Sequence, residues 1–214
     1  MKTLLYIEAS PRGELSASSR AATQLLDLVK GRAPQARIDH LNIWAADLPP
    51  FDGEALAAKY ARLGGKPLSE PQQRAWEEIG RHVARLDAAD AVLISTPMWN
   101  LGIPYRLKHL FDLVTQPGLS FSFDPSIGYT PILKPRPTAV LMASSGDFTQ
   151  GPSYGRPDLA STYLRTELAF IGLRDPEIVH IAPTAGPPDA VEAGRERARP
   201  QIGKVSEWLA GALR

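Results

Sequence analysis

The chain has 214 residues, 43% of them hydrophobic and 22% charged, which is enough for a full core, and we expect residues 1–214 to form a single domain. Its 24 Lys and Arg residues nearly balance 23 Asp and Glu residues, so no charge excess indicates nucleic acid or an anionic membrane surface as a partner. Because the chain has no cysteine, disulfides, thiolate metal sites and cysteine nucleophiles are excluded, and redox chemistry would require a cofactor.

The N-terminal segment gives no sign of export. Its apolar run, within residues 1–8, is far shorter than the roughly 7–15 residues of a signal-peptide core. No stretch approaches the roughly 18 apolar residues of a membrane span. We therefore expect a cytoplasmic protein.

Short apolar runs alternate with longer amphipathic segments along the whole chain, which is the pattern of repeated βα units and a parallel sheet. The segments that we expect to be strands are residues 4–9, 36–43, 91–95, 138–143 and 177–181. Five such units predict an α/β protein, a flavodoxin-like three-layer sandwich with a five-stranded parallel sheet.

Helical spacing of apolar residues predicts the segments between the strands. The first helix is expected to begin at Ser18 or Ser19 as N-cap, and the later ones cover residues 54–63, 70–86, a stretch behind Pro104, 159–171 and 189–213. Pro200 is expected to kink or split the last helix, because its ring displaces a backbone hydrogen bond. Residues 119–133 are harder to place, and their aromatics and prolines indicate an ordered excursion from the sheet.

A serine-rich loop follows the first expected strand and contains Ser10, Gly13, Ser16, Ala17 and Ser18. A helix N-terminus offers unpaired N–H groups and the positive end of the peptide dipole, and serine hydroxyls add donors, so such a loop can hold a phosphate monoester. The same serines would also be present if they only capped the helix, and this loop alone leaves both interpretations open. The glycine motifs of nucleoside triphosphatases and dinucleotide-binding proteins are absent, which favours a mononucleotide.

A second loop, Pro97 to Pro104, follows the third expected strand and contains Met98, Trp99, Asn100 and Leu101. An isoalloxazine ring needs a flat apolar partner and hydrogen bonds to its polar edge, which an indole, an amide and turn amides can supply. The alternative is that Trp99 belongs to the core and Asn100 is an ordinary turn residue. With the serine loop, this segment favours a flavin mononucleotide site.

Two further segments are candidates for the same cleft. Ser144, Ser145, Gly146 and Asp147 follow the fourth expected strand and either bind the other edge of the flavin or form only a turn. Phe121 and Phe123 lie in the 119–133 excursion and either line a substrate pocket or fill the core beneath a long loop.

Several segments together resemble the FMN-dependent NADH-quinone oxidoreductase and NADH-azoreductase family of the flavodoxin-like quinone reductases. The resemblance covers nearly the whole chain and is carried by residues 10–20, 48–52, 97–108 and 118–121, of which the Pro-Met-Trp-Asn segment is the most specific. It implies that Ser10 and residues 16–18 hold the FMN phosphate, that residues 98–101 meet the ring, and that residues 144–147 close its far edge. Where the family usually has Ser-Arg-Gly-Gly, this chain has Ser145 and Asp147, a carboxylate that would disfavour a negatively charged reduced flavin and alter its redox potential.

The resemblance also implies a mechanism and an assembly. NADH or NADPH would pass a hydride to N5 of FMN, and a quinone or azo compound would then enter the same space and collect the electrons, so that no side chain acts as a catalytic acid, base or nucleophile. Family members are dimers with the flavin at the subunit interface, so a homodimer is expected.

The same residues bear on three other classes of protein. The rival hypothesis is a flavodoxin-like electron carrier or redox-sensing module that holds FMN without small-molecule turnover; such carriers tend to be strongly acidic, whereas this chain is nearly neutral. The four histidines lack the spacing of metal ligands, so no metal is expected. The segment Ser144-Ser145-Gly146 lacks the nucleophile elbow of serine hydrolases.

Overall fold

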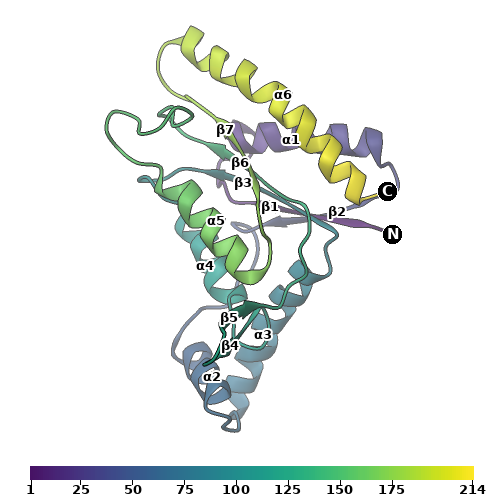
Figure 1. Ribbon diagram of the computed structural model, residues 1–214, viewed down its shortest axis with the longest axis vertical. Helices are drawn as coiled ribbons and strands as arrows, with labels where there is room; N and C mark the ends of the chain where they lie inside the picture. The colour runs from purple at the N-terminus through teal and green to yellow at the C-terminus, as the bar shows by residue number, and fades with distance from the viewer.

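A five-stranded, all-parallel sheet lies at the centre of the molecule, in the order β2-β1-β3-β6-β7 (Figure 1). The computed structural model describes residues 1–214. The strands of the sheet are β1 (Thr3–Glu8), β2 (Arg37–Asn42), β3 (Ala91–Pro97), β6 (Thr138–Ala143) and β7 (Glu177–Ile181). All five are the strands predicted from sequence, and the bounds of β6 and β7 are those predicted.

Helices cover both faces of this sheet (Figure 1). One face carries α1 (Ala17–Arg32) and α6 (Pro188–Ala212). The opposite face carries α3 (Glu70–Asp87), α4 (Tyr105–Val114) and α5 (Leu159–Ile171), and α2 (Gly53–Leu63) packs against α3. The predicted three-layer α/β sandwich is therefore confirmed. No helix combines the length and the apolar composition that crossing a bilayer would require.

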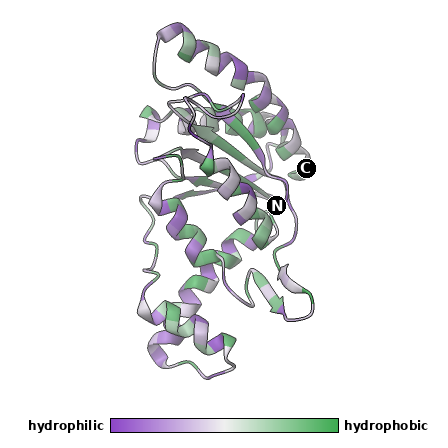
Figure 2. Cartoon of the chain, turned by 60° about the vertical axis from the view of Figure 1, so that its left-hand side comes forward, coloured by the Kyte–Doolittle hydropathy of each residue, from purple (hydrophilic) through white to green (hydrophobic).

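Two apolar cores follow from the alternation of side chains along the strands. In β1, Leu4 and Tyr6 pack toward α1 and α6, whereas Leu5 and Ile7 pack toward α3, α4 and α5. Figure 2 shows the resulting distribution, with hydrophobic strands between helices whose outer faces are more hydrophilic. Since a parallel sheet is covered on both sides, its central strands are apolar without a polar face.

The sheet order positions a crevice. β1 pairs with β2 on one side and with β3 on the other, so the connections that leave the carboxyl ends of β1 and β3 run to opposite faces of the sheet. Ligands of open α/β sheets bind outside the carboxyl ends of the strands at this kind of switch point. The serine loop follows β1 and the Trp99 loop follows β3, so both border the switch point.

Three local expectations needed correction or refinement. The N-cap of α1 is Ser16, and neither Ser18 nor Ser19, because the Ser16 side chain accepts the Ser19 amide while residues 17–19 are already helical. Pro200 does not split the last helix: α6 continues through it, and because Pro200 is exposed, water can satisfy the carbonyl that loses its partner. The excursion is an antiparallel hairpin of β4 (Phe121–Asp124) and β5 (Gly128–Pro131).

Candidate functional site

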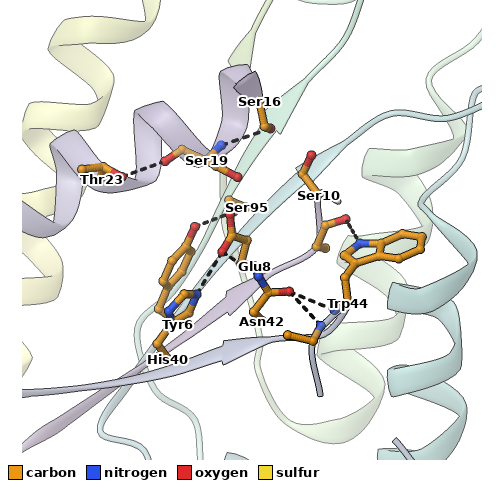
Figure 3. A network of polar contacts seen from close by, with 12 residues as sticks. Tyr6, Glu8, Ser10, Ser16, Ser19, Thr23, His40, Asn42, Trp44 and Ser95 are labelled. Atoms are coloured by element: carbon orange, nitrogen blue, oxygen red, sulfur yellow. Dashed lines mark hydrogen bonds and ion pairs between the residues drawn. The ribbon is translucent and has the colours of Figure 1, made fainter. Parts of the chain in front are cut away.

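The start of α1 presents free backbone donors beside buried hydroxyls. Ser16 Oγ accepts the Ser19 amide at 3.3 Å and lies 3.0 Å from Ser18 Oγ. The amides of Ala17 and Ser18 have no acceptor within the chain, and Ser10, Ser16 and Ser18 are all buried. Figure 3 shows Ser10, Ser16 and Ser19 close to one another above the end of β1. Buried polar groups are rarely left without partners, so this arrangement suits an anionic ligand.

A polar network holds the strand end from which this loop departs (Figure 3). The buried carboxylate of Glu8 contacts His40 Nε2 at 3.1 Å and accepts Asn42 Nδ2 at 3.3 Å. The hydroxyl of Tyr6 lies 2.9 Å from Ser95 Oγ, and burial raises the pKa of Tyr6 to about 12. These contacts join β1, β2 and β3 beneath the serine loop, so the loop rests on a rigid base.

The loop after β3 is a tight two-residue turn. Trp99 and Gly102 exchange backbone hydrogen bonds of 2.9 Å, and both central residues have positive φ, 50° for Asn100 and 69° for Leu101, the signature of a type I′ turn. A leucine in this region is strained, and such strain concentrates at functional sites. The amides of Asn100 and Leu101 have no acceptor in the chain, so they are free to donate to a ligand.

The Trp99 ring lies partly in solvent. Its side chain packs at a tilt against Trp44, with ring centroids 5.8 Å apart, and the residue remains 36% exposed. The Trp44 indole is itself fixed, because its Nε1 donates to the carbonyl of Ala9 at 3.1 Å. Trp99 is thus supported from behind and presents a flat apolar surface at the switch point.

The loop after β6 is held by its own side chains and by α6. Ser144 Oγ donates to the carbonyl of Gly146 at 2.8 Å. Asp147 accepts the Thr149 amide and hydroxyl at 3.0 and 2.6 Å and Arg197 Nη2 at 2.6 Å. Burial alone would raise the pKa of Asp147, but these hydrogen bonds and the Arg197 charge outweigh it and lower the pKa. The carboxylate that departs from the family pattern is therefore ionised and paired with an arginine.

A pocket of about 400 Å³ opens between these loops. Six residues predicted from sequence line it: Ser10, Ser16, Ala17, Met98, Trp99 and Ser145. The other predicted cofactor residues belong to the same three loops without lining this pocket: Ser18, Asn100, Leu101, Ser144, Gly146 and Asp147. The structure therefore brings the three predicted loops together at one edge of the sheet.

The pocket is also lined by residues that the sequence analysis did not assign to it. They come from the serine loop, from α1, from β7 and the segment after it, and from α6: Arg12, Leu15, Arg20, Ile181, Pro183, Thr184, Val191 and Arg195. Arg12 and Arg20 lie inside the recognised serine segment, so their charge was a usable signal. Arg195 offered none, because it lies in a run of charged residues typical of a solvated helix face.

Phe121 and Phe123 lie away from this pocket. Phe121 is buried, with its ring centroid 4.9 Å from that of Phe170 in α5, so within one chain it fills the core under the hairpin. Phe123 is 56% exposed and packs on Tyr129 at 4.9 Å. Their assignment to a substrate pocket stays a prediction that depends on a second subunit.

The residues present fit FMN. Unpartnered amides and buried hydroxyls at the α1 terminus suit a phosphate monoester, and the supported Trp99 ring with the free amides of its turn suits a flat heterocycle with a polar edge. Together the sheet order and this pocket define an α/β protein of the flavodoxin-like class.

Comparison with known proteins agrees with this assignment. A protein-family model, described as having a flavodoxin-like fold, matches residues 2–205 of this chain. A protein of Bradyrhizobium diazoefficiens named FMN-dependent NADH:quinone oxidoreductase 1 is 44% identical over 209 residues, covering 98% of this chain and 100% of the relative. One from Ruegeria pomeroyi, named FMN-dependent NADH:quinone oxidoreductase, is 40% identical over 200 residues, 92% of this chain and 97% of the relative. The chain belongs to this flavodoxin-like family of FMN-dependent NADH:quinone oxidoreductases.

Solved structures share the fold. The azoreductase from Bacillus anthracis strain Sterne superposes with a TM-score of 0.86 at 24% identity, covering 96% of this chain and 99% of that one. An FMN-dependent NADH-azoreductase from Bacillus anthracis strain Ames Ancestor, solved in complex with FMN, gives a TM-score of 0.82 at 23% identity and covers 96% and 100%. The predicted flavodoxin-like fold is confirmed.

Proposed function

We propose that this chain is an FMN-dependent oxidoreductase that uses NADH or NADPH to reduce quinones and, reductively, azo compounds. The observation that carries the proposal is the single pocket that joins the phosphate-type donors of α1 to the Trp99 turn. The names of the relatives with 44% and 40% identity support the same activity. Bound FMN would supply hydride chemistry, so the protein needs no acid, base or nucleophile of its own.

The residues of the site divide into three roles. Ser10, Ser16 and the amides of residues 17–18 hold the phosphate. Met98, Trp99 and the amides of Asn100 and Leu101 border the ring and orient it. Residues 144–147 close the far edge, and the bonds that Asp147 receives from Thr149 and Arg197 hold that loop in place.

We also propose that residues 1–214 act as one domain and assemble as a homodimer. The β4–β5 hairpin supports this, because Phe123, Ile127 and Tyr129 are all more than half exposed, an apolar group of the kind that subunit interfaces cover. In such a dimer, the Phe123 ring would be available to line the partner's substrate pocket.

The alternative is an electron carrier that binds FMN without turnover. An enzyme is favoured because relatives at 44% and 40% identity are named FMN-dependent NADH:quinone oxidoreductases, and because the chain is nearly neutral, whereas small electron carriers tend to be strongly acidic. The experiment is NADH oxidation by the purified yellow protein with and without a quinone. Acceptor-dependent oxidation over many turnovers is expected, whereas bound flavin without turnover identifies a carrier, and protein that takes up no FMN when folded refutes both.

A further inference from the structure

The pocket has an uneven charge distribution. Three arginines line it, Arg12, Arg20 and Arg195, and no aspartate or glutamate does. The chain as a whole has a formal net charge of only +1, so this concentration is local. Arg12 lies in the serine loop, Arg20 in the first turn of α1, and Arg195 in the second turn of α6. We call these three residues the arginine rim.

Two arginines of the rim, Arg20 and Arg195, lack strong partners. Arg20 Nη1 donates only to the backbone carbonyl of Glu14, at 3.0 Å. Arg195 Nη1 pairs with Glu192 at 3.1 Å, but their side chains are 53% and 56% exposed, and exposed pairs of this kind contribute little to stability. Glu192 lines a neighbouring groove and not the pocket. Both guanidinium groups are therefore available to a more highly charged acceptor.

The neighbouring groove contains an arginine of α6 that lies outside the pocket. It runs between α1 and α6, shares Arg20 and Arg195 with the pocket, and continues to Gln24 and Arg199. Arg199 lies one turn beyond Arg195 on the same helix, pairs with Glu196 at 3.0 Å, and does not line the pocket. Arg195 thus lines both the pocket and the groove, whereas Arg199 lines only the groove.

The chemistry of the pocket separates two kinds of donor. Serine hydroxyls and peptide amides bind a phosphate without balancing its charge, whereas a guanidinium forms charge-assisted hydrogen bonds that are roughly twice as strong. We propose that Arg20 and Arg195, from two different helices, bind the phosphate of FMN across the pocket and make the chain selective for the phosphorylated flavin over uncharged riboflavin. This inference rests on the proposed function, since it assigns the pocket to FMN.

The test measures flavin affinity and not only turnover. Flavin-loaded enzyme is diluted stepwise, and recovery of free-flavin fluorescence gives the dissociation constant for FMN or, after exchange, for riboflavin. We expect Arg20→Gln and Arg195→Gln each to weaken FMN binding about tenfold and to leave riboflavin binding unchanged. Raising the salt concentration to about 0.2 M should weaken FMN binding to the wild type more than to the double variant.

Arg199→Gln is the matched control, because it removes the same charge from the same helix outside the pocket, and it should leave both flavins bound as in the wild type. The three substituted arginines are exposed, so any fall in the melting temperature of the FMN-loaded Arg20 and Arg195 variants should reflect only their weaker FMN binding. The inference is overturned if the rim variants hold FMN as tightly as the wild type, if they lose riboflavin equally, or if they raise KM for NADH alone, which would assign the rim to the donor. Wild-type protein that binds no FMN at all refutes the proposed function instead.

Discussion

Arg136 caps the C-terminus of α3, away from the pocket. Its side chain is only 6% exposed, and its Nη1 donates to the carbonyls of Leu86, Asp87 and Ala89 at 2.8, 2.6 and 2.7 Å. These are carbonyls at the C-terminus of α3, where helical partners run out. Arg136→Met should therefore lower the free energy of unfolding by about 3 kcal/mol, as measured by urea denaturation.

Arg136→Lys is the control for charge. An ammonium group keeps the positive charge but lacks the fork that reaches three carbonyls and the Asp87 carboxylate together, so it should recover only part of the loss. A full recovery by lysine, or a loss below about 1 kcal/mol for methionine, would contradict the capping role.

At residue level, the sequence located residues of the pocket where the signal is local. Ser10, Ser16 and Trp99 line the pocket because they lie in the loops that leave β1 and β3, and the chain itself carries these loops to the switch point. The partner of Asp147 and the position of Arg195 at the pocket were missed because both depend on how α6 docks. Arg197 is 50 residues from Asp147, and no periodicity within either segment indicates that the two meet.

At the scale of elements, the seating of α6 determines the shape of the pocket. Gly194 lies so close to β7 that an added Cβ would stand 2.3 Å from the carbonyl oxygen of Ala182. Arg197 Nη2 donates to that same carbonyl at 2.9 Å. Gly194→Ala should push the first turns of α6 away, destabilise the protein by about 3 kcal/mol and weaken FMN binding by displacing Arg195.

Gly203→Ala is the matched control on the same helix. A Cβ there meets nothing within 4 Å, and alanine is the better helix former, so this variant should gain up to about 1 kcal/mol and bind FMN normally. Urea denaturation and flavin fluorescence report both quantities. Equal behaviour of the two alanine variants would show that the close approach of α6 to Ala182 is unimportant.

The sequence predicted the strands of the sheet accurately. It predicted less well the continuity of α6 at Pro200 and the β4–β5 hairpin, because both depend on tertiary packing. Continuous apolar runs identified β1, β3 and β6, because strands buried on both faces carry that pattern in sequence. The edge strand β2 is mostly exposed or half-buried, and its sequence is more polar. The expected break at Pro200 rested on the local effect of proline alone. In the structure, Ile202, Val205 and Leu209 of α6 are buried against the sheet, and this packing stabilises the helix on the far side of Pro200. The β4–β5 hairpin was seen only as an excursion because its prolines and exposed aromatics do not alternate cleanly.

At the scale of the whole molecule, the buried titratable groups set a pH range of stability. Burial lowers the pKa of His82 and His180 from the ordinary 6.5, so both are neutral in the fold, and stability falls as pH drops below about 6.5 because the unfolded chain then binds more protons. A hydrogen bond from Arg85 lowers the pKa of Asp39 from 3.8. The ionised Asp39 therefore stabilises the fold above pH of about 3.8, and this stabilisation is lost in stronger acid. Burial raises the pKa of Tyr6 from 10.0 to about 12, so stability declines again as pH rises through that interval.

His180→Gln separates the histidine step from the rest. His180 lies in β7 at the edge of the sheet, its Nδ1 is buried without a partner, and its Nε2 stands 4.0 Å from a carboxylate oxygen of Asp158. Burial outweighs the attraction of Asp158 and Asp147 and lowers the pKa of His180, so protonation in the fold is disfavoured. Between pH 7 and 5, each such proton makes the free energy of unfolding fall by up to about 1.4 kcal/mol per pH unit. The glutamine variant should show a shallower fall over this range, because it lacks the proton that the unfolded wild type takes up on His180. Both proteins are compared by urea denaturation with the same excess of FMN, so that titration of the cofactor phosphate cancels, and an unchanged slope between pH 7 and 5 would remove His180 from the acid response.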